Sequence, residues 1–338
     1  MRVVEYLSPT AIAQYYKDPQ EYYLRYLSDN RPPRFAQTRA MSIGSSFDAY
    51  VKSYLHQALF GKDNDPKFVF ENIFEAQVEQ HNRDWALAAG RYVFGCYRNS
   101  GALGDLMIML QGATNTPRFE FDLMGAVSGS RESVDLTIGD VILMGKPDLH
   151  FRNNEGADVV FDWKVNGYCS SRNVSPAKGY VKLRDGWSGV QSRTHGQSHK
   201  DAFVTYVKGI PVNCAHKMEE VDEDWANQLS VYGWLLGLPV GGDFIVAIDQ
   251  LACDGSKTEL PKIRIAEHRT TVSETHQRTF LKKAVDLWNI IHSDHYFTDV
   301  SLDESKARCA ALDTVAKGLE GETAEDEWFR QVTRGLAQ

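Results

Sequence analysis

The sequence has few cysteines, no long hydrophobic run and no secretory signal pattern, and each absence excludes a class of protein. Only 5 of its 338 residues are cysteine, and no two of them form a Cys-x-x-Cys pair. Scattered cysteines in odd number favour free thiols in a reducing compartment over a disulfide framework. No apolar stretch approaches the roughly 18 residues that a membrane-spanning helix needs, and the first residues lack the basic-then-apolar order of a signal peptide. The sequence therefore predicts a globular protein of the cytoplasm without a membrane partner.

Motifs of several enzyme classes are missing as well. There is no Gly-x-x-x-x-Gly-Lys-(Ser/Thr) sequence, which argues against an ATP-driven motor, and no Gly-x-Ser-x-Gly elbow of a serine hydrolase. His195 and His199, with Cys214 and His216 downstream, raise the question of zinc, but the histidine pair lies in a Gly/Ser-rich loop, which disfavours a structural zinc site. The 45 acidic side chains exceed the 37 Lys and Arg, giving a net charge of -8. That balance argues against a protein that coats nucleic acid, although it is compatible with a local basic surface.

The first third of the chain has the pattern of helices. Apolar and aromatic residues recur at three-to-four spacing over 42–60, and similar patterns cover 8–26, where Pro19 is expected to break or restart the helix, and 67–99. Residues 1–116 are therefore predicted to form an α-rich N-terminal region.

From Pro117 onward the pattern changes to that of strands. Short β-branched runs, separated by Gly, Asp and Asn turn signals, predict one strand each at 118–123, 133–139, 141–151 and 157–165. Two later helices are predicted at 225–236 and 273–291. We expect residues 117–300 to form a core with a mixed central β-sheet flanked by helices, an α/β fold. Residues 301–338, with 8 acidic against 5 basic side chains, are predicted to form an acidic helical tail.

The most informative stretch joins Pro147-Asp148 to Asp162-Trp163-Lys164. Asp162 ends an apolar run, and positions i and i+2 of a strand point to the same face, so Asp162 and Lys164 project together while Trp163 faces away. Asp148 is within reach of Asp162 if the two strands pair antiparallel. Two converging carboxylates suit a hard divalent cation, and a neighbouring lysine can orient water or offset charge on a phosphate. This combination indicates metal-assisted hydrolysis of a phosphodiester.

A plainer interpretation is a strand end whose Asp and Lys form a solvated ion pair. The (Asp/Glu)-x-Lys triplet is common, and this chain has two more, at 65–67 and 304–306, in a polar loop and a surface helix. Glu120 and Asp122 alternate on a strand and are interpreted as the polar face of an edge strand.

Flanking motifs favour the functional interpretation. The ordered set resembles the RecB-like branch of the PD-(D/E)xK nuclease superfamily over roughly residues 7–250. Its elements here are Leu7-Ser8-Pro9-Thr10, Gly44-x-x-x-Asp48, Pro147-Asp148, Asp162-Trp163-Lys164 and Gln228-x-x-x-Tyr232. Asp48 stands where many relatives have histidine, and its oxygen ligand still suits Mg²⁺ or Mn²⁺. The cysteines that hold an iron–sulfur cluster in some members are absent, so no cluster is predicted.

The resemblance implies a restriction-endonuclease-like PD-(D/E)xK core and a role for each matched residue. Asp48, Asp148 and Asp162 would bind Mg²⁺ or Mn²⁺ together with the backbone carbonyl of Val165, and Lys164 would be the catalytic lysine. Gln228 and Tyr232, four residues apart on one helix face, would hold the lysine or the DNA backbone. Considered alone, this pair is better explained as a surface glutamine and a core tyrosine.

Residues 170–200 supply a candidate DNA contact. They carry six basic side chains against one acidic, with Tyr180 and Trp187 between them, which suits either phosphate and base contacts or a solvated loop. The sequence as a whole predicts a metal-dependent DNA exonuclease of recombination, repair or replication, with an annealing protein or helicase as a possible partner. The alternatives are a catalytically silent nucleic-acid-binding module of the same fold and a structure-specific or nicking endonuclease.

Overall fold

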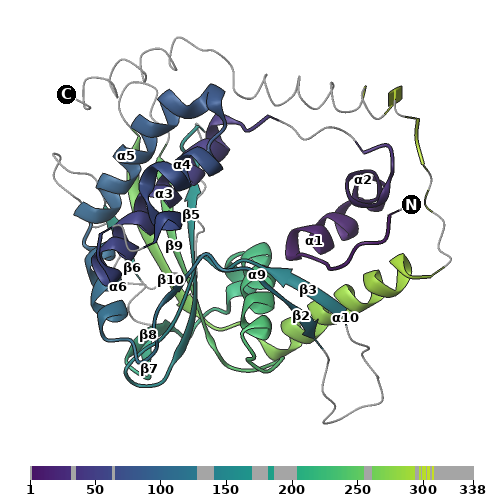
Figure 1. Ribbon diagram of the computed structural model, residues 1–338. Coiled ribbons are helices and arrows are strands. Elements are labelled where there is room, and N and C mark those ends of the chain that lie inside the picture. Colours follow the sequence, from purple (N-terminus) through teal and green to yellow (C-terminus); the bar gives the residue numbers. More distant parts are fainter. Residues whose placement is uncertain are drawn as a thin grey trace.

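The protein is an α/β structure with a mixed six-stranded sheet covered by helices on both faces (Figure 1). The computed structural model describes residues 2–31, 36–62, 65–127, 141–169, 182–185, 204–254 and 261–293, with a few positions between 297 and 307. The predicted α/β class with a mixed central sheet is confirmed. Of the helices in these residues, none is both long and apolar enough to cross a bilayer.

The chain enters through two short helices. Ser8 accepts a hydrogen bond from the Ala11 N–H group and starts α1 (Pro9–Lys17), and Asp18 caps α2 (Pro19–Tyr22) in the same way. Pro19 is the first residue of α2, where its missing N–H group leaves no helical bond unmade. The helix therefore restarts at Pro19, as predicted, and continues into a π-helical turn at Tyr23–Leu27.

The remaining helices of the N-terminal region pack on one another beside the sheet. They are α3 (Arg39–Phe60), α4 (Phe70–Gln77), α5 (Arg83–Asn99) and α6 (Ala102–Gln111). The helical pattern predicted over 67–99 is confirmed for most of its length, as the two helices α4 and α5 with a 3-10 turn at Gln80–Asn82 between them. A further 3-10 turn at Pro66–Phe68 precedes α4. Gly90 of α5 meets α3 at Ser46, where a Cβ atom would lie 2.1 Å from the serine Oγ. The bare glycine allows these two helices to approach closely.

One parallel pair lies at the centre of the sheet. The strand order is β1-β4-β5-β9-β10-β6, and only β5 and β9 run parallel. Two hairpins, β2–β3 and β7–β8, stand apart from this sheet. The strands are β1 (Arg118–Phe119), β2 (Leu123–Val127), β3 (Val141–Gly145), β4 (Leu149–Arg152), β5 (Asp158–Asn166), β6 (Lys182–Asp185), β7 (Val204–Val207), β8 (Ile210–Asn213), β9 (Ile245–Asp254) and β10 (Lys262–Thr270).

The run from Val141 to Phe151, expected to be one strand, is two. β3 pairs with β2 and, through Leu7, with the N-terminal segment, whereas β4 pairs with β5 of the large sheet. Pro147 lies in the break and cannot donate to a sheet ladder, so the chain changes sheets there. The predicted strand over 133–139 and nearly all of 301–338 lie outside the described residues.

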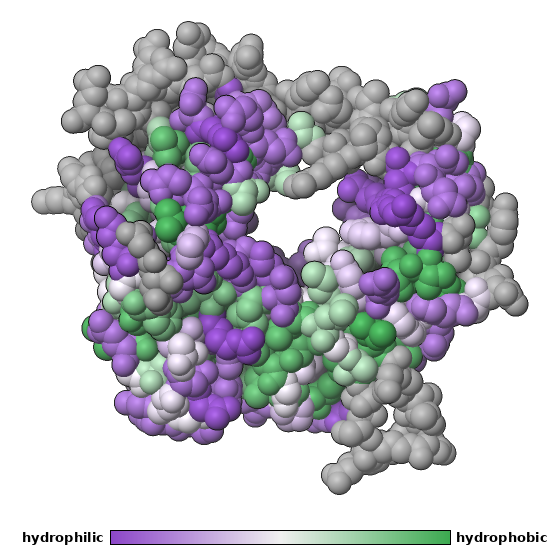
Figure 2. Space-filling model, viewed as in Figure 1, coloured by the Kyte–Doolittle hydropathy of each residue, from purple (hydrophilic) through white to green (hydrophobic). Residues whose placement is uncertain are grey.

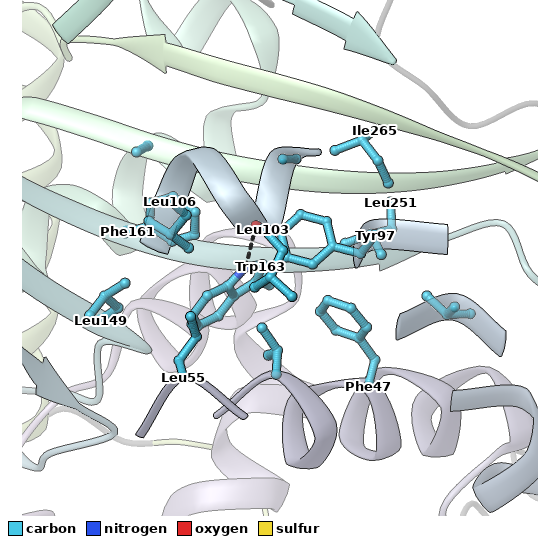
Figure 3. Close-up of a cluster of buried hydrophobic side chains, with 14 of the residues drawn as sticks. Phe47, Leu55, Tyr97, Leu103, Leu106, Leu149, Phe161, Trp163, Leu251 and Ile265 are labelled. Atoms are coloured by element: carbon cyan, nitrogen blue, oxygen red, sulfur yellow. Dashed lines mark hydrogen bonds between the residues drawn. The ribbon is translucent and has the colours of Figure 1, made fainter. Parts of the chain in front are cut away.

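Two hydrophobic cores cover the two faces of the large sheet. Alternate residues of β5 point to opposite sides: Phe161 and Trp163 pack against α3, α5 and α6, while Val160 packs against α9 (Glu223–Leu235) and α10 (Glu274–Ile291). Figure 3 shows the first core, in which Phe47 and Leu55 of α3 approach Trp163. A strand buried on both faces needs this continuous apolar sequence. Both α1 and α2 belong to the second core, so residues 1–116 supply helices to both faces.

The surface divides in a similar way. Figure 2 shows hydrophilic residues gathered over the helices at the upper left and upper right of the view. Hydrophobic residues gather in the lower centre, over α9, β2 and β3. Met124 of β2 is 64% exposed.

Candidate active site

Asp148 lies where β4 and β5 begin to separate. The last paired positions of the two strands are Leu149 and Phe161. Two residues after Phe161, the Trp163 N–H group donates to the Asp148 carboxylate at 3.2 Å, so the side chain replaces a main-chain acceptor. The main-chain carbonyl of Asp148 accepts from the Glu120 N–H group at 3.1 Å. The antiparallel β4–β5 pair that the sequence required is confirmed, and it brings Asp148 to Asp162.

The Asp148 and Asp162 carboxyl groups hydrogen-bond to each other. Burial and the negative charge of Asp148 raise the pKa of Asp162 well above its usual range. Burial acts in the same direction on Asp148, but Lys52, the hydrogen bond from Asp162 and Lys164 outweigh it and lower the Asp148 pKa to about 2. The two carboxyl groups therefore titrate as one pair, in which Asp162 holds a proton more readily than Asp148 does.

Lys164 forms an ion pair with Asp162 on the face of β5 that is covered by α9. Its side chain is 24% exposed and that of Asp162 is 4% exposed, so the lysine is partly accessible while the acid is buried. Burial would lower the pKa of Lys164, but the charges of Asp162 and Asp148 raise it. Lys164 is a cation at neutral pH, positioned beside two acids at the edge of the buried region.

Two residues of helix α9 extend the hydrogen-bond network that begins at Lys164. Gln228 accepts from the lysine Nζ at 3.0 Å and donates through its amide nitrogen to the Tyr232 hydroxyl at 2.6 Å. The four-residue separation places both side chains on one face of the helix, as the sequence predicted. Tyr232 is buried, and burial followed by the Asp162 charge raises its pKa. The motif residues of α9 and β5 thus form one chain of hydrogen bonds.

Asp48 reaches the acids through a lysine that sequence reasoning missed. Lys52, one helical turn after Asp48 on α3, places its Nζ 2.7 Å from Asp48, 2.8 Å from Asp148 and 3.5 Å from Glu120. Its side chain is only 2% exposed. Burial raises the pKa of Asp48 to about 6 against the opposing effect of Lys52. The i, i+4 spacing of Asp48 and Lys52 was the available signal, because a lysine in the apolar face of a predicted helix needs a buried partner.

Glu120 corrects a sequence interpretation. It was expected on the polar face of an edge strand, but β1 ends at Phe119 and Glu120 has a φ of 40°, in the left-handed region. This turn directs the carboxylate inward, where it contacts Lys52 and Lys146 and accepts from Gln77 at 3.3 Å. The Lys52 and Lys146 charges lower the Glu120 pKa despite its burial. The alternating sequence does not predict a left-handed backbone turn at Glu120.

Val165, the remaining predicted ligand, follows Lys164 in β5 and pairs with Leu251 of β9. Its side chain packs against the first core. The role expected for its backbone carbonyl stays a prediction. Of the basic segment 170–200, only the backbone of β6 is described, and His195 and His199 lie outside the described residues.

The possible metal donors of this site are carboxylates that already contact ammonium groups. Within the described part of the chain, no three His, Cys, Asp or Glu side chains are grouped so that they could hold a metal ion as they stand. The ammonium groups of Lys52 and Lys164 lie against the carboxylates instead. Asp148 and Asp162 nevertheless fit a hard cation. Two carboxyl groups in contact need a positive charge between them, here a proton, and a metal ion can displace that proton.

The opposite face of β5 holds Trp163 in a buried polar network. The indole N–H donates to the Tyr97 hydroxyl at 3.3 Å (Figure 3). Tyr97 in turn donates to Asp249, which forms a buried ion pair with Arg269 at 2.5 Å. Since Trp163 lies between Asp162 and Lys164, this network fixes the strand that presents them. The signal for it was Asp249 itself, an acid within the apolar run of β9.

Gly145 provides a test of how closely Tyr232 must approach the sheet. A Cβ atom at Gly145 would lie 2.6 Å from the Tyr232 ring. We expect Gly145→Ala to displace this ring and to lower the free energy of unfolding by about 1–3 kcal/mol, the usual cost of overpacking. Urea unfolding measures the change.

Gly44→Ala is the matched control for Gly145→Ala. No atom lies within 4 Å of a Cβ at Gly44, which is inside α3. Alanine there is expected to raise the free energy of unfolding by about 0.5–1 kcal/mol, because alanine favours the helix. Equal behaviour of the two variants would show that Tyr232 does not depend on the bare glycine.

Comparisons with known proteins do not assign a family to this chain. A scan against protein families, a search of curated proteins and a search of solved structures each found no match. The resemblance to RecB-like nucleases stays a prediction from motifs, and the function is inferred from the residues of this chain.

Proposed function

We propose that this protein is a Mg²⁺- or Mn²⁺-dependent DNA exonuclease with a PD-(D/E)xK core. The observation that carries the proposal is the meeting of Asp148, Asp162, Lys164, Gln228 and Tyr232, which come from three separate parts of the sequence. An ion pair at a strand end, the plainer interpretation, would not need a second acid in contact with the first or a glutamine holding the lysine.

The protein's own residues suit phosphodiester hydrolysis. A divalent cation held by Asp148 and Asp162 would polarise the scissile phosphate and lower the pKa of a bound water. Lys164 has its ammonium held by Asp162 and Gln228, and can orient that water and offset charge on the phosphate. The Tyr232 hydroxyl accepts from Gln228, so its own proton can be donated to a phosphate oxygen. Asp48 and Val165 are the other ligands that the resemblance implies.

The proposal is tested with end-labelled linear duplex and single-stranded DNA. We expect progressive release of nucleotides in Mg²⁺ or Mn²⁺, none in EDTA, and no attack on covalently closed circular DNA, which has no ends. Nicking of the circle would replace the exonuclease by an endonuclease at the same site. DNA binding without cleavage of any substrate would overturn the enzymatic proposal in favour of a binding module.

A further inference from the structure

Lys52 is a buried cation that the proposed reaction does not use. Its ammonium group contacts Asp48, Asp148 and Glu120 at 2.7, 2.8 and 3.5 Å, and its side chain is 2% exposed. A charged amine is kept out of water only where several acids surround it. Three carboxylates from α3, from the β1 end and from the start of β4 therefore converge on this one side chain.

Three carboxylates that surround one point also offer the oxygen ligands that a hard divalent cation takes. Asp148 has its Oδ1 atom on Lys52 and its Oδ2 atom on the Trp163 N–H group, beside Asp162. It thus separates two cation positions, one filled by Lys52 and one at the Asp148–Asp162 contact. In two-metal nucleases a shared carboxylate commonly lies between ions about 3.5–4 Å apart.

Asp48 and Glu120 also accept from other donors, which hold their carboxylates beside Lys52. Gln77 donates to Asp48 at 3.0 Å and to Glu120 at 3.3 Å, and Lys146 forms an ion pair with Glu120. Counting all the acids and lysines of the site as ionised, four carboxylates face three ammonium groups, an excess of one negative charge. One divalent cation would change the sign of this total, and a second would leave a strongly positive cluster.

We propose that the Lys52 ammonium permanently takes the second cation position, so that the site binds a single divalent ion. This inference rests on the proposed function. In it, Asp148 and Asp162 bind the metal, whereas Asp48 and Glu120 bind Lys52. Asp48 is then a positioning residue that acts through the lysine, in place of the metal ligand that the resemblance implies.

The test is calorimetric titration of the full chain with Mn²⁺ alone. We expect one ion per chain for the unmodified protein. Asp162→Asn, which removes a direct ligand, is expected to lower Mn²⁺ affinity by more than about 100-fold, and Asp48→Asn, an outer partner, by about tenfold. Lys52→Met should admit a second ion and show a larger rise in Tm on Mn²⁺ addition than the unmodified protein does. Lys67→Met is the matched control and should leave the count at one. Its ammonium donates to the Glu120 main-chain carbonyl at 2.7 Å and, within the described residues, forms no ion pair with the acids of the site.

Two ions per chain in the unmodified protein, no bound ion, or an equal loss of affinity in Asp48→Asn and Asp162→Asn would each overturn the proposal. These outcomes do not depend on Lys52→Met being stable enough to purify. DNA cleavage is measured on the same samples. Cleavage with two bound ions would retain the nuclease and reject the role of Lys52, whereas one bound ion without cleavage would reject the nuclease and retain the lysine as a cation in the site.

Discussion

Replacing Asp162 with asparagine is expected to lower the rate of DNA hydrolysis by about 10³-fold or more, because it removes a charge that both the metal and Lys164 need. Asp162 contacts Asp148 on one side and the Lys164 ammonium on the other. An asparagine amide has nearly the same shape but no charge. Its NH2 group is a donor and cannot accept the proton that the Lys164 ammonium donates to the carboxylate. The measurement is the initial rate on linear DNA in Mg²⁺, with thermal unfolding as a check that the variant is folded.

Asp158→Asn is the matched control for this prediction. Asp158 lies on the same strand and the same face, four residues earlier, where it pairs with Arg152 at 2.9 Å and His150 at 3.2 Å. It contacts none of the site residues, so cleavage should stay within a factor of about two, as for substitutions that leave the reacting groups in place. Full activity of Asp162→Asn would exclude β5 as the catalytic strand.

Replacing Arg269 with methionine is expected to lower the free energy of unfolding by about 3–5 kcal/mol, since it leaves a buried acid without its cation. Asp249 is 0% exposed and is held by Arg269 at 2.5 Å and by the Tyr97 hydroxyl. The guanidinium also donates to two main-chain carbonyls and lies 4.9 Å from the Phe161 ring centroid. Urea unfolding followed by circular dichroism measures the loss.

Arg278→Met makes the same substitution in an exposed ion pair. Arg278 contacts Glu274 one turn earlier on α10 at 2.7 Å, in solvent. Pairs of this kind contribute about 0.5 kcal/mol or less, so the control should unfold close to the unmodified protein. If both variants lost equally little, the Asp249–Arg269 pair would not be the element that anchors Trp163 and the strand carrying Asp162.

The sequence predicted helices and strands correctly where residue type and local spacing decide the structure. Ser8, Pro19 and the four-residue spacing of Gln228 and Tyr232 follow from helix geometry, and the alternation in β5 correctly separated Trp163 from Asp162 and Lys164. The break at Pro147 was missed, because an apolar run followed by Pro-Asp looks like one strand until the partner strands are known. The helical pattern over 67–99 is confirmed for most of its length, but it did not locate the turn between α4 and α5, because the packing of these helices against α3 decides where that turn lies.

The sequence by itself determined which acids, which lysine and which helix face belong to the motif set, because these depend on residue type and on periods of two and 3.6 residues. Only the tertiary structure decided that Glu120 turns inward, that Lys52 lies among the acids and that Asp249 and Arg269 support Trp163 from the opposite face. These contacts join residues up to 152 positions apart, and no local pattern records such a pairing. The physical reason is burial: a charge removed from water must find its partner wherever the packed chain brings one.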